Sequence, residues 1–157
     1  MKLIFLDFEG VITSMHYYLH GHKGRLYDNV FFSVYDPDAI DLVNTIIEQT
    51  GAKIVLISDK CVYNKKGRLP NLLKKIGIYG DLYCNLPCKF TTTQPPSIND
   101  KLYSIQNLVK SIDDENLTYC ILSSSEPVNP VMNLIKTSYI TGITSKDVEE
   151  AINILNC

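Results

Sequence analysis

The chain begins with a short apolar run that leads into two acidic residues and a glycine. Residues 3–6 (Leu-Ile-Phe-Leu) are followed directly by Asp7, Phe8, Glu9 and Gly10. A continuous apolar run of this length is typical of a parallel strand that is buried on both faces. In open parallel sheets, ligands bind outside the carboxyl ends of the strands, and a glycine there permits a sharp turn. A carboxylate in that position can attack phosphorus or hold a metal ion, so this segment indicates phosphoryl chemistry.

The rest of the chain alternates between strand and helix patterns. Asp36 as a cap, Pro37 in the first turn and Gly51 as a stop predict one helix. Further helices are expected over 69–76, 100–111 and 145–155 (capped by Ser145), strands over 53–58, 81–86, 118–123 and 138–141, and a loop over 91–96. This alternation predicts a three-layer, Rossmann-like α/β fold with a mostly parallel central sheet. We expect one domain over residues 1–157.

Residues 13–36 break the alternation and are rich in aromatic residues and glycine. We expect an irregular flap here, with a short hairpin. His16 and His20 would share a face only if their stretch were helical, and nearby glycines argue against a helix. We therefore expect the flap to line the mouth of the pocket, where aromatic rings either stack on a nucleobase or cover the edge of the core. The tyrosines concerned are Tyr17, Tyr18 and Tyr27.

Composition excludes several classes of protein. Of the 157 residues, 45% are hydrophobic and 20% charged, and the net charge of −2 predicts no broad basic surface. No apolar run approaches the roughly 20 residues that span a bilayer, and the early acidic residues interrupt any signal peptide. Five cysteines at irregular spacing predict free thiols in a reducing, cytoplasmic compartment. Cys84 and Cys88 form only half of a zinc pattern.

The strand ends together resemble the motifs of the haloacid dehalogenase (HAD) superfamily of phosphotransferases. Residues 7–11 (Asp-Phe-Glu-Gly-Val) resemble its first motif, Asp-x-Asp-Gly-Val/Thr. Ser58 resembles the Ser or Thr of the second motif, and Lys101 is the best match to the basic residue of the third. Residues 121–126 (Ile-Leu-Ser-Ser-Ser-Glu) resemble the fourth. The chain is most similar to small capless HAD domains associated with RNA repair, which share a late Gly-hydrophobic-Thr element such as residues 142–144.

The resemblance implies a role for each matched residue. Asp7 would be the nucleophile that forms an aspartyl-phosphate, and Glu9 would protonate the leaving oxygen and then activate water. Ser58 would donate a hydrogen bond to a phosphoryl oxygen, and Lys101 would neutralise its charge. Ser58 also suits an ordinary strand-end hydroxyl, and other lysines compete with Lys101. Residues expected to contact the substrate are Gly10, Asp59, Lys60, Ser123 and Ser124.

Two departures from the family pattern bear on the metal. Active relatives hold Mg²⁺ through the first Asp, the backbone carbonyl of the second acidic residue and a carboxylate of the fourth motif, which implies Asp7, Glu9 and Glu126 here. Serines replace the fourth-motif carboxylates, and neutral hydroxyls are poor Mg²⁺ ligands. Glu in place of Asp moves the carboxyl of the second acidic residue by roughly 1.5 Å. A displacement of about 1 Å can cost about a hundredfold in rate.

Two functions remain open on these observations. The first is a Mg²⁺-dependent phosphomonoesterase that acts through Asp7. Its site would be open, because residues 59–100 leave no room for a cap domain. An open site suits a large substrate, either a phosphorylated protein or a nucleic-acid end. The second is an inactive pseudophosphatase that serves as a binding or assembly module for a protein partner.

Overall fold

The structure is a computed structural model that describes residues 1–20, 26–28, 33–58, 68–86, 97–127, 129 and 131–157. In chain order, the elements are β1 (Lys2–Leu6), α1 (Met15–His20), β2 (Leu26–Asp28), β3 (Ser33–Tyr35), α2 (Pro37–Thr50), β4 (Lys53–Leu56), α3 (Arg68–Ile76), β5 (Leu82–Asn85), α4 (Ile98–Ser111), β6 (Thr118–Ser123), β7 (Leu134–Lys136) and α5 (Ser145–Asn156). The main sheet has the order β5-β4-β1-β6-β7, and all its pairs are parallel.

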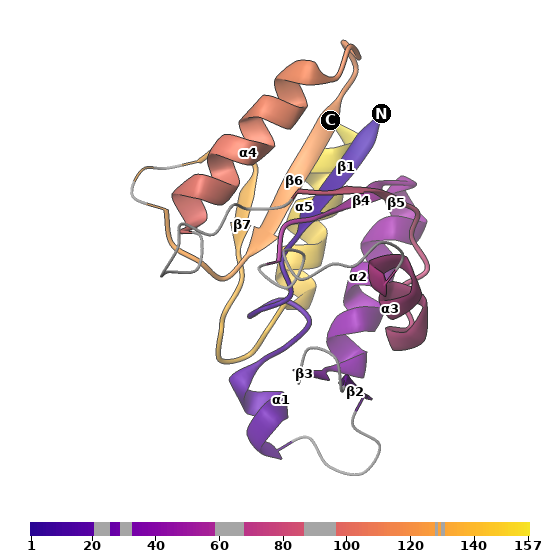
Figure 1. Cartoon of the computed structure of the whole chain (residues 1–157), viewed down its shortest axis with the longest axis vertical. Helices are drawn as coiled ribbons and strands as arrows, with labels where there is room; N and C mark the ends of the chain where they lie inside the picture. Colours follow the sequence, from indigo (N-terminus) through magenta and orange to yellow (C-terminus); the bar gives the residue numbers. More distant parts are fainter. Residues whose placement is uncertain (21–25, 29–32, 59–67, 87–96, 128, 130) are drawn as a thin grey trace.

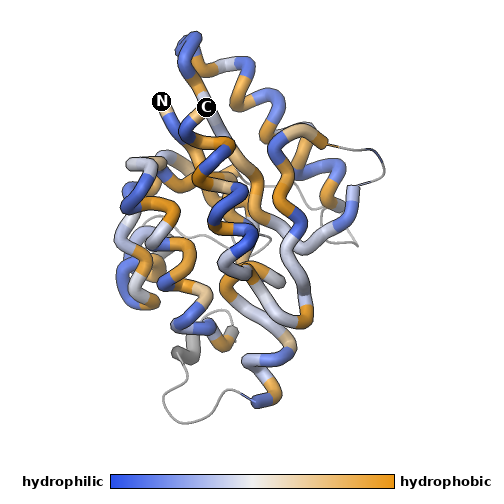
Figure 2. Tube along the Cα trace, turned by 180° about the vertical axis from the view of Figure 1, so that it is seen from behind, coloured by the Kyte–Doolittle hydropathy of each residue, from blue (hydrophilic) through white to orange (hydrophobic). Residues whose placement is uncertain are grey.

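Helices cover both faces of this sheet (Figure 1). In β1, Leu3 and Phe5 point to the face covered by α4, whereas Ile4 and Leu6 point to the opposite face, which α2, α3 and α5 cover. Alternate side chains of one strand therefore supply two cores, as the pleat of a strand requires. Figure 2 shows hydrophobic residues recurring along the helices, which is the pattern of helices with one face on a sheet. The predicted three-layer α/β fold is confirmed.

Helix ends follow the signals in the sequence, with one difference. The Asp36 carboxylate accepts a hydrogen bond from Asp38 N–H at 3.0 Å, and Gly51 ends α2 with φ 67°. Such a cap and a left-handed glycine are the usual limits of a helix. The last helix is capped by Thr144, rather than by Ser145 as predicted, because the Thr144 hydroxyl and Asp147 form a capping box.

Two predictions of local structure were wrong. Residues 138–141 do not form a strand: they form a turn in which Gly142 N–H donates to the Ser138 carbonyl at 2.7 Å, and the last strand, β7, precedes it. Within the flap, residues 15–20 form the helix α1, where Tyr17 N–H donates to Ser14 Oγ at 3.1 Å in the first turn. The expected hairpin is present as β2 and β3. The predicted loop over 91–96 lies outside the described residues.

The two ends of the chain lie together at the amino end of the sheet (Figure 1). The Met1 ammonium contacts Asp114 Oδ2 at 2.6 Å, and Lys2 Nζ donates to Asn156 Oδ1 at 2.6 Å. Both contacts lie at the start of β1, so they are separated from the carboxyl end by the length of that strand.

Within the described ranges, no helix is both long enough and apolar enough to cross a membrane. Three cysteines in these ranges, Cys84, Cys120 and Cys157, are free thiols. Cys61 and Cys88 lie outside the described residues.

Candidate active site

Polar side chains collect where β1, β4 and β6 end. Asp7 and Ser58 follow β1 and β4, and Ser123 is the last residue of β6; all three are buried. These strands are neighbours in a parallel sheet, so their carboxyl ends meet at one edge, which is where open α/β sheets bind ligands. Buried polar groups require hydrogen-bond partners: Ser123 donates to Asp7, and Ser58 donates to Glu9 in the turn after β1.

The Asp7 carboxylate is held by three donors. Lys101 Nζ lies 2.8 Å from Oδ2, and Ser123 Oγ donates to the same oxygen at 3.1 Å. Phe8 N–H donates to Oδ1 at 2.9 Å. The side chains of Asp7 and Lys101 are 2% and 5% exposed, so water hardly screens their attraction. The carboxylate is therefore fixed in position beside a positive charge.

Burial raises the pKa of Asp7 from 3.8 to about 6. The Lys101 ammonium lowers this pKa, whereas the neighbouring Glu9 carboxyl raises it again by charge repulsion and by a hydrogen bond between the two side chains. Two interacting carboxyls tend to retain one proton between them. The pKa of about 6 therefore belongs to the two carboxyls together, beside the Lys101 ammonium.

The turn after Asp7 fits closely against the end of β6. Ser124 Oγ donates to the Glu9 carbonyl at 2.8 Å, while Ser58 Oγ donates to Glu9 Oε2 at 3.0 Å. Gly10 has φ 71°, and a Cβ at this position would overlap Ser124. The glycine is thus required both by the backbone conformation and by the close approach of the two segments.

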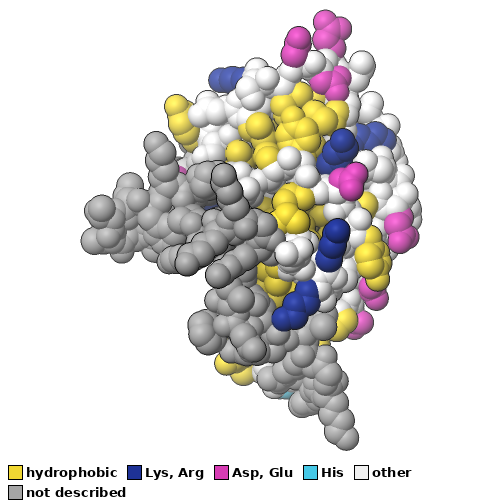
Figure 3. All heavy atoms as spheres, turned by 45° about the vertical axis from the view of Figure 1, so that its right-hand side comes forward, with side chains coloured by type: hydrophobic (Ala, Val, Ile, Leu, Met, Phe, Trp, Pro, Cys, Tyr) yellow, Lys and Arg dark blue, Asp and Glu magenta, His cyan; other side chains and the backbone are white. Residues whose placement is uncertain are grey.

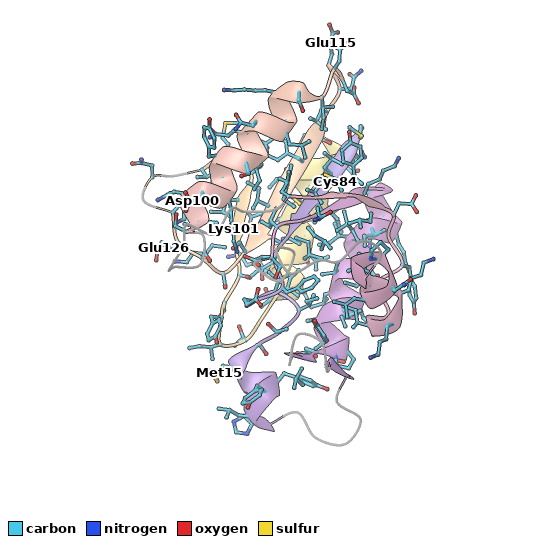
Figure 4. All side chains as sticks on the ribbon, viewed as in Figure 1. Met15, Cys84, Asp100, Lys101, Glu115 and Glu126 are labelled. Atoms are coloured by element: carbon cyan, nitrogen blue, oxygen red, sulfur yellow. The ribbon has the colours of Figure 1, made fainter. Side chains whose placement is uncertain are left out.

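Lys101 reaches Asp7 because it lies on the buried face of α4. The buried residues of this helix, Ile98, Lys101, Leu102 and Ile105, have the spacing of one helical face. Ser97 and Asp100 form a capping box that sets where the helix begins, and hence where this face points. Figure 4 shows Lys101 in the first turns of α4, near the strand ends. A lysine on the apolar face of a helix is the sequence signal that points to Lys101. The competing Lys65, Lys66 and Lys89 lie outside the described residues.

The remaining predicted residues are placed differently. Glu126 is 77% exposed and pairs with Lys136 at 2.8 Å, and Figure 4 shows it on the loop beyond β6. Its predicted role as a metal ligand stays a prediction. Asp59 and Lys60, expected to contact the substrate, lie outside the described residues.

Thr137 belongs to this group of residues but was missed. Its buried Oγ1 donates to the Gly10 carbonyl at 2.5 Å, so it holds the same turn from the other side. It directly follows β7, as Ser58 lies just beyond β4. The signal of a strand-end hydroxyl was present in the sequence, but the strand itself was placed too late.

The donor set offers a divalent cation one carboxylate and several neutral oxygens. Ser123 Oγ donates to Asp7 Oδ2 and Ser124 Oγ donates to the Glu9 carbonyl, so the end of β6 brings one hydroxyl to each of these two oxygens. Mg²⁺ sites at phosphates commonly use one or two carboxylates together with substrate oxygens. These oxygens are of the type that binds Mg²⁺, so the residues present fit the ion. The site carries less negative charge than it would with a second carboxylate at the end of β6. Within the described part of the chain, no three His, Cys, Asp or Glu side chains group as a metal site.

The parallel sheet with an Asp-x-Glu-Gly turn at the end of its central strand defines a HAD-type domain. The chain belongs to the family described as the HAD domain in Swiss Army Knife RNA repair proteins, whose model matches residues 3–148. Membership associates it with HAD-type hydrolases or phosphatases and with RNA repair. Neither a curated protein nor a solved structure matched the chain.

Proposed function

We propose that this protein is a slow, Mg²⁺-dependent phosphomonoesterase that removes a terminal phosphate from RNA through an aspartyl-phosphate. The observation that carries the proposal is the meeting of four side chains from three separate segments: the turn after β1, the end of β4 and the helix α4. Lys101 lies against Asp7 at 2.8 Å, and Ser58 lies against Glu9 at 3.0 Å. These are the groups that such a reaction requires: a nucleophile, a proton donor, a positive charge and a hydroxyl donor.

In the first step, the ionised Asp7 carboxylate attacks phosphorus and the bond from phosphorus to the leaving oxygen breaks. Glu9 gives its proton to that oxygen, and the Lys101 ammonium balances charge on the transferring group. In the second step, Glu9 takes a proton from water, the water oxygen attacks phosphorus, and inorganic phosphate leaves Asp7. Asp7 Oδ2, the Glu9 carbonyl and the two serine hydroxyls would hold Mg²⁺, which would reduce repulsion between carboxylate and phosphate.

Slow turnover is expected for two reasons. One charged ligand gives a weaker metal site than two, so the metal should be needed at high concentration. The Glu9 side chain is also a methylene longer than the Asp of the family pattern, and Ser58 holds its carboxyl by a hydrogen bond. The carboxyl of Glu9 is therefore displaced from the position that an Asp carboxyl would take beside the leaving oxygen.

The test is phosphate release from an aryl phosphate and from a short RNA with a terminal phosphate, over a series of Mg²⁺ concentrations. We expect Asp7→Asn to abolish release and the exposed Asp113→Asn to leave it unchanged. Because attack needs ionised Asp7, kcat/KM should rise with pH through about 6, the pKa of that carboxyl. Ser123→Asp combined with Ser124→Asp should lower the Mg²⁺ concentration required.

A binding module is the second candidate. It is favoured by Ser123 and Ser124, which stand where the family pattern has the metal-binding carboxylates of the fourth motif. In that case, wild-type protein would show no release above background at any concentration of a divalent metal. It would still bind the phosphorylated RNA, and Asp7→Asn would bind as well. That pair of results would replace the phosphatase with a pseudophosphatase.

A further inference from the structure

Exposed apolar side chains gather on α1 and on the turn that follows β7. The set is called the α1–turn surface and consists of Met15, Tyr18, Leu19, Tyr139 and Ile140. Tyr18 is 57% exposed, Tyr139 55% and Ile140 64%. Single exposed apolar residues are ordinary, but a group of large ones on two adjoining segments indicates an interaction site.

Two backbone hydrogen bonds join the halves of this surface. Met15 N–H donates to the Tyr139 carbonyl at 3.1 Å, and His16 N–H donates to the Ile140 carbonyl at 2.8 Å. Tyr18 and Leu19 follow Met15 by three and four residues, so the three side chains share one face of α1. The surface is therefore formed by two segments that are fixed to each other by backbone contacts.

Histidine rings border the same helix. The ring centroids of His16 and His20 are 5.0 Å apart with 49° between the planes, and both residues are exposed. The helix that brings them together was not expected from the sequence. Tyrosine and histidine rings are the side chains on which unpaired nucleobases stack in RNA-binding proteins.

The α1–turn surface adjoins the candidate active site. Thr137, two residues before Tyr139, donates to the Gly10 carbonyl, and a Cβ on Gly10 would lie 3.0 Å from Tyr139 Cα. Ile143 N–H donates to the Val11 carbonyl at 3.1 Å on the far side of the turn. The turn thus packs along the loop that carries Glu9. Figure 4 shows Met15 on α1, beyond the strand ends where Lys101 lies.

The charge of the molecule restricts how it would hold RNA. Proteins that follow the phosphate backbone neutralise many phosphates, which requires an excess of basic residues. The net charge here is −2. On the face shown in Figure 3, basic and acidic side chains are interspersed among the described residues, without a continuous basic stripe. Stacking of bases on aromatic side chains is a contact with RNA that needs no such excess of basic residues.

We infer that the α1–turn surface stacks the terminal nucleobases of single-stranded RNA whose end phosphate lies at Asp7. The inference rests on the proposed function for the location of the phosphate. It assigns the substrate class to a nucleic-acid end rather than a phosphoprotein. Tyr18 and Tyr139 are the residues expected to contact the bases.

The test measures the affinity of a fluorescent eight-nucleotide RNA with a terminal phosphate, by anisotropy, in EDTA so that no turnover occurs. Tyr18→Ala and Tyr139→Ala should each weaken binding by about 5- to 150-fold, the range for loss of one stacking ring. Tyr18→Phe and Tyr139→Phe should bind within about twofold of wild type, because they keep the ring. Tyr79→Ala is the matched control, since Tyr79 is 78% exposed at a different place.

An RNA with abasic terminal nucleotides should bind more weakly to wild type and should not respond to the tyrosine variants. Unchanged affinity of the base-bearing RNA in both alanine variants would overturn the inference and would leave the surface to a protein partner. Release of phosphate from glycerol phosphate, which has no base, reports on the proposed function separately. If release fails while the tyrosine effects hold, the proposed phosphatase fails and the stacking surface stands.

Discussion

The buried pair of Lys101 and Asp7 makes a prediction that involves both stability and the site. Lys101→Met removes the ammonium and keeps an unbranched side chain of similar length. Asp7→Asn removes the negative charge and keeps the shape. Each single variant leaves one buried charge without its opposite, because the two side chains are only 5% and 2% exposed and lie 2.8 Å apart.

The expected magnitude follows from this burial. Breaking one side of a buried ion pair costs about 3–5 kcal/mol, whereas replacing both partners together is often close to neutral. At pH 8 Lys101→Met should therefore lose about 3–5 kcal/mol. Asp7→Asn should lose less, because burial already disfavours the ionised carboxylate, and the double variant should lose much less than the sum of the two. At pH 5 Asp7 is largely protonated, since its pKa is about 6, so the pair is weaker and Lys101→Met should cost less.

Urea denaturation followed by circular dichroism gives the free energies of unfolding of wild type, the two single variants and the double variant, four values at pH 8 and four at pH 5. Sites that do not interact give additive changes within about 0.5 kcal/mol. Additive losses at pH 8 would refute the reasoning, because they would mean that the two charges do not stabilise each other. Asp113→Asn, at an exposed position, should have the same free energy of unfolding as wild type. This control checks that removal of a carboxylate does not by itself destabilise the protein.

Three further predictions concern the turn, the pH and the thiols. Burial raises the folded-state pKa of Asp7 from 3.8 to about 6, so the folded state binds a proton at a higher pH than the unfolded state does. Between pH 7 and pH 4, the free energy of unfolding of wild type should therefore rise by about 2–3 kcal/mol relative to that of Asp7→Asn, as measured in urea titrations. Gly10→Ala adds a Cβ at φ 71° against Ser124 and should lose about 2–5 kcal/mol, seen as a lower Tm; an unchanged Tm would contradict the close fit. Burial raises the pKa of Cys120 to about 12, so in folded protein a thiol reagent should label exposed Cys157 and spare Cys120, as peptide mapping would show.

The sheet and most helices could be predicted because their signals are local. Asp36, Pro37 and Gly51 limit α2 by backbone chemistry that depends on no distant contact. The strand β7 was misplaced because three residues, 134–136, are too few to show a period. The turn over 138–141 (Ser-Tyr-Ile-Thr) contains Tyr, Ile and Thr, which are common in strands. The helix α1 was missed because its start is fixed by backbone contacts with the distant turn after β7, which no local pattern in the sequence shows.

The site was predictable to the extent that it follows from the sheet. Asp7, Ser58 and Ser123 meet because parallel neighbours end at one edge of the sheet, and the parallel direction of the strands follows from their alternation with helices. The choice of Lys101 needed the register of α4, which the sequence shows only through the spacing of its apolar residues. The contact between Glu9 and Ser58 depends on side-chain reach across two loops, and no local pattern encodes it.

The position of the chain ends has a practical consequence for handling this protein. Met1 and Asn156 are anchored at the end of the sheet opposite Asp7. A purification tag, a fluorophore or a surface linker joined at either end would project away from Asp7. Immobilised protein should therefore present the carboxyl ends of its strands to the solution, which suits it to binding measurements on a sensor chip.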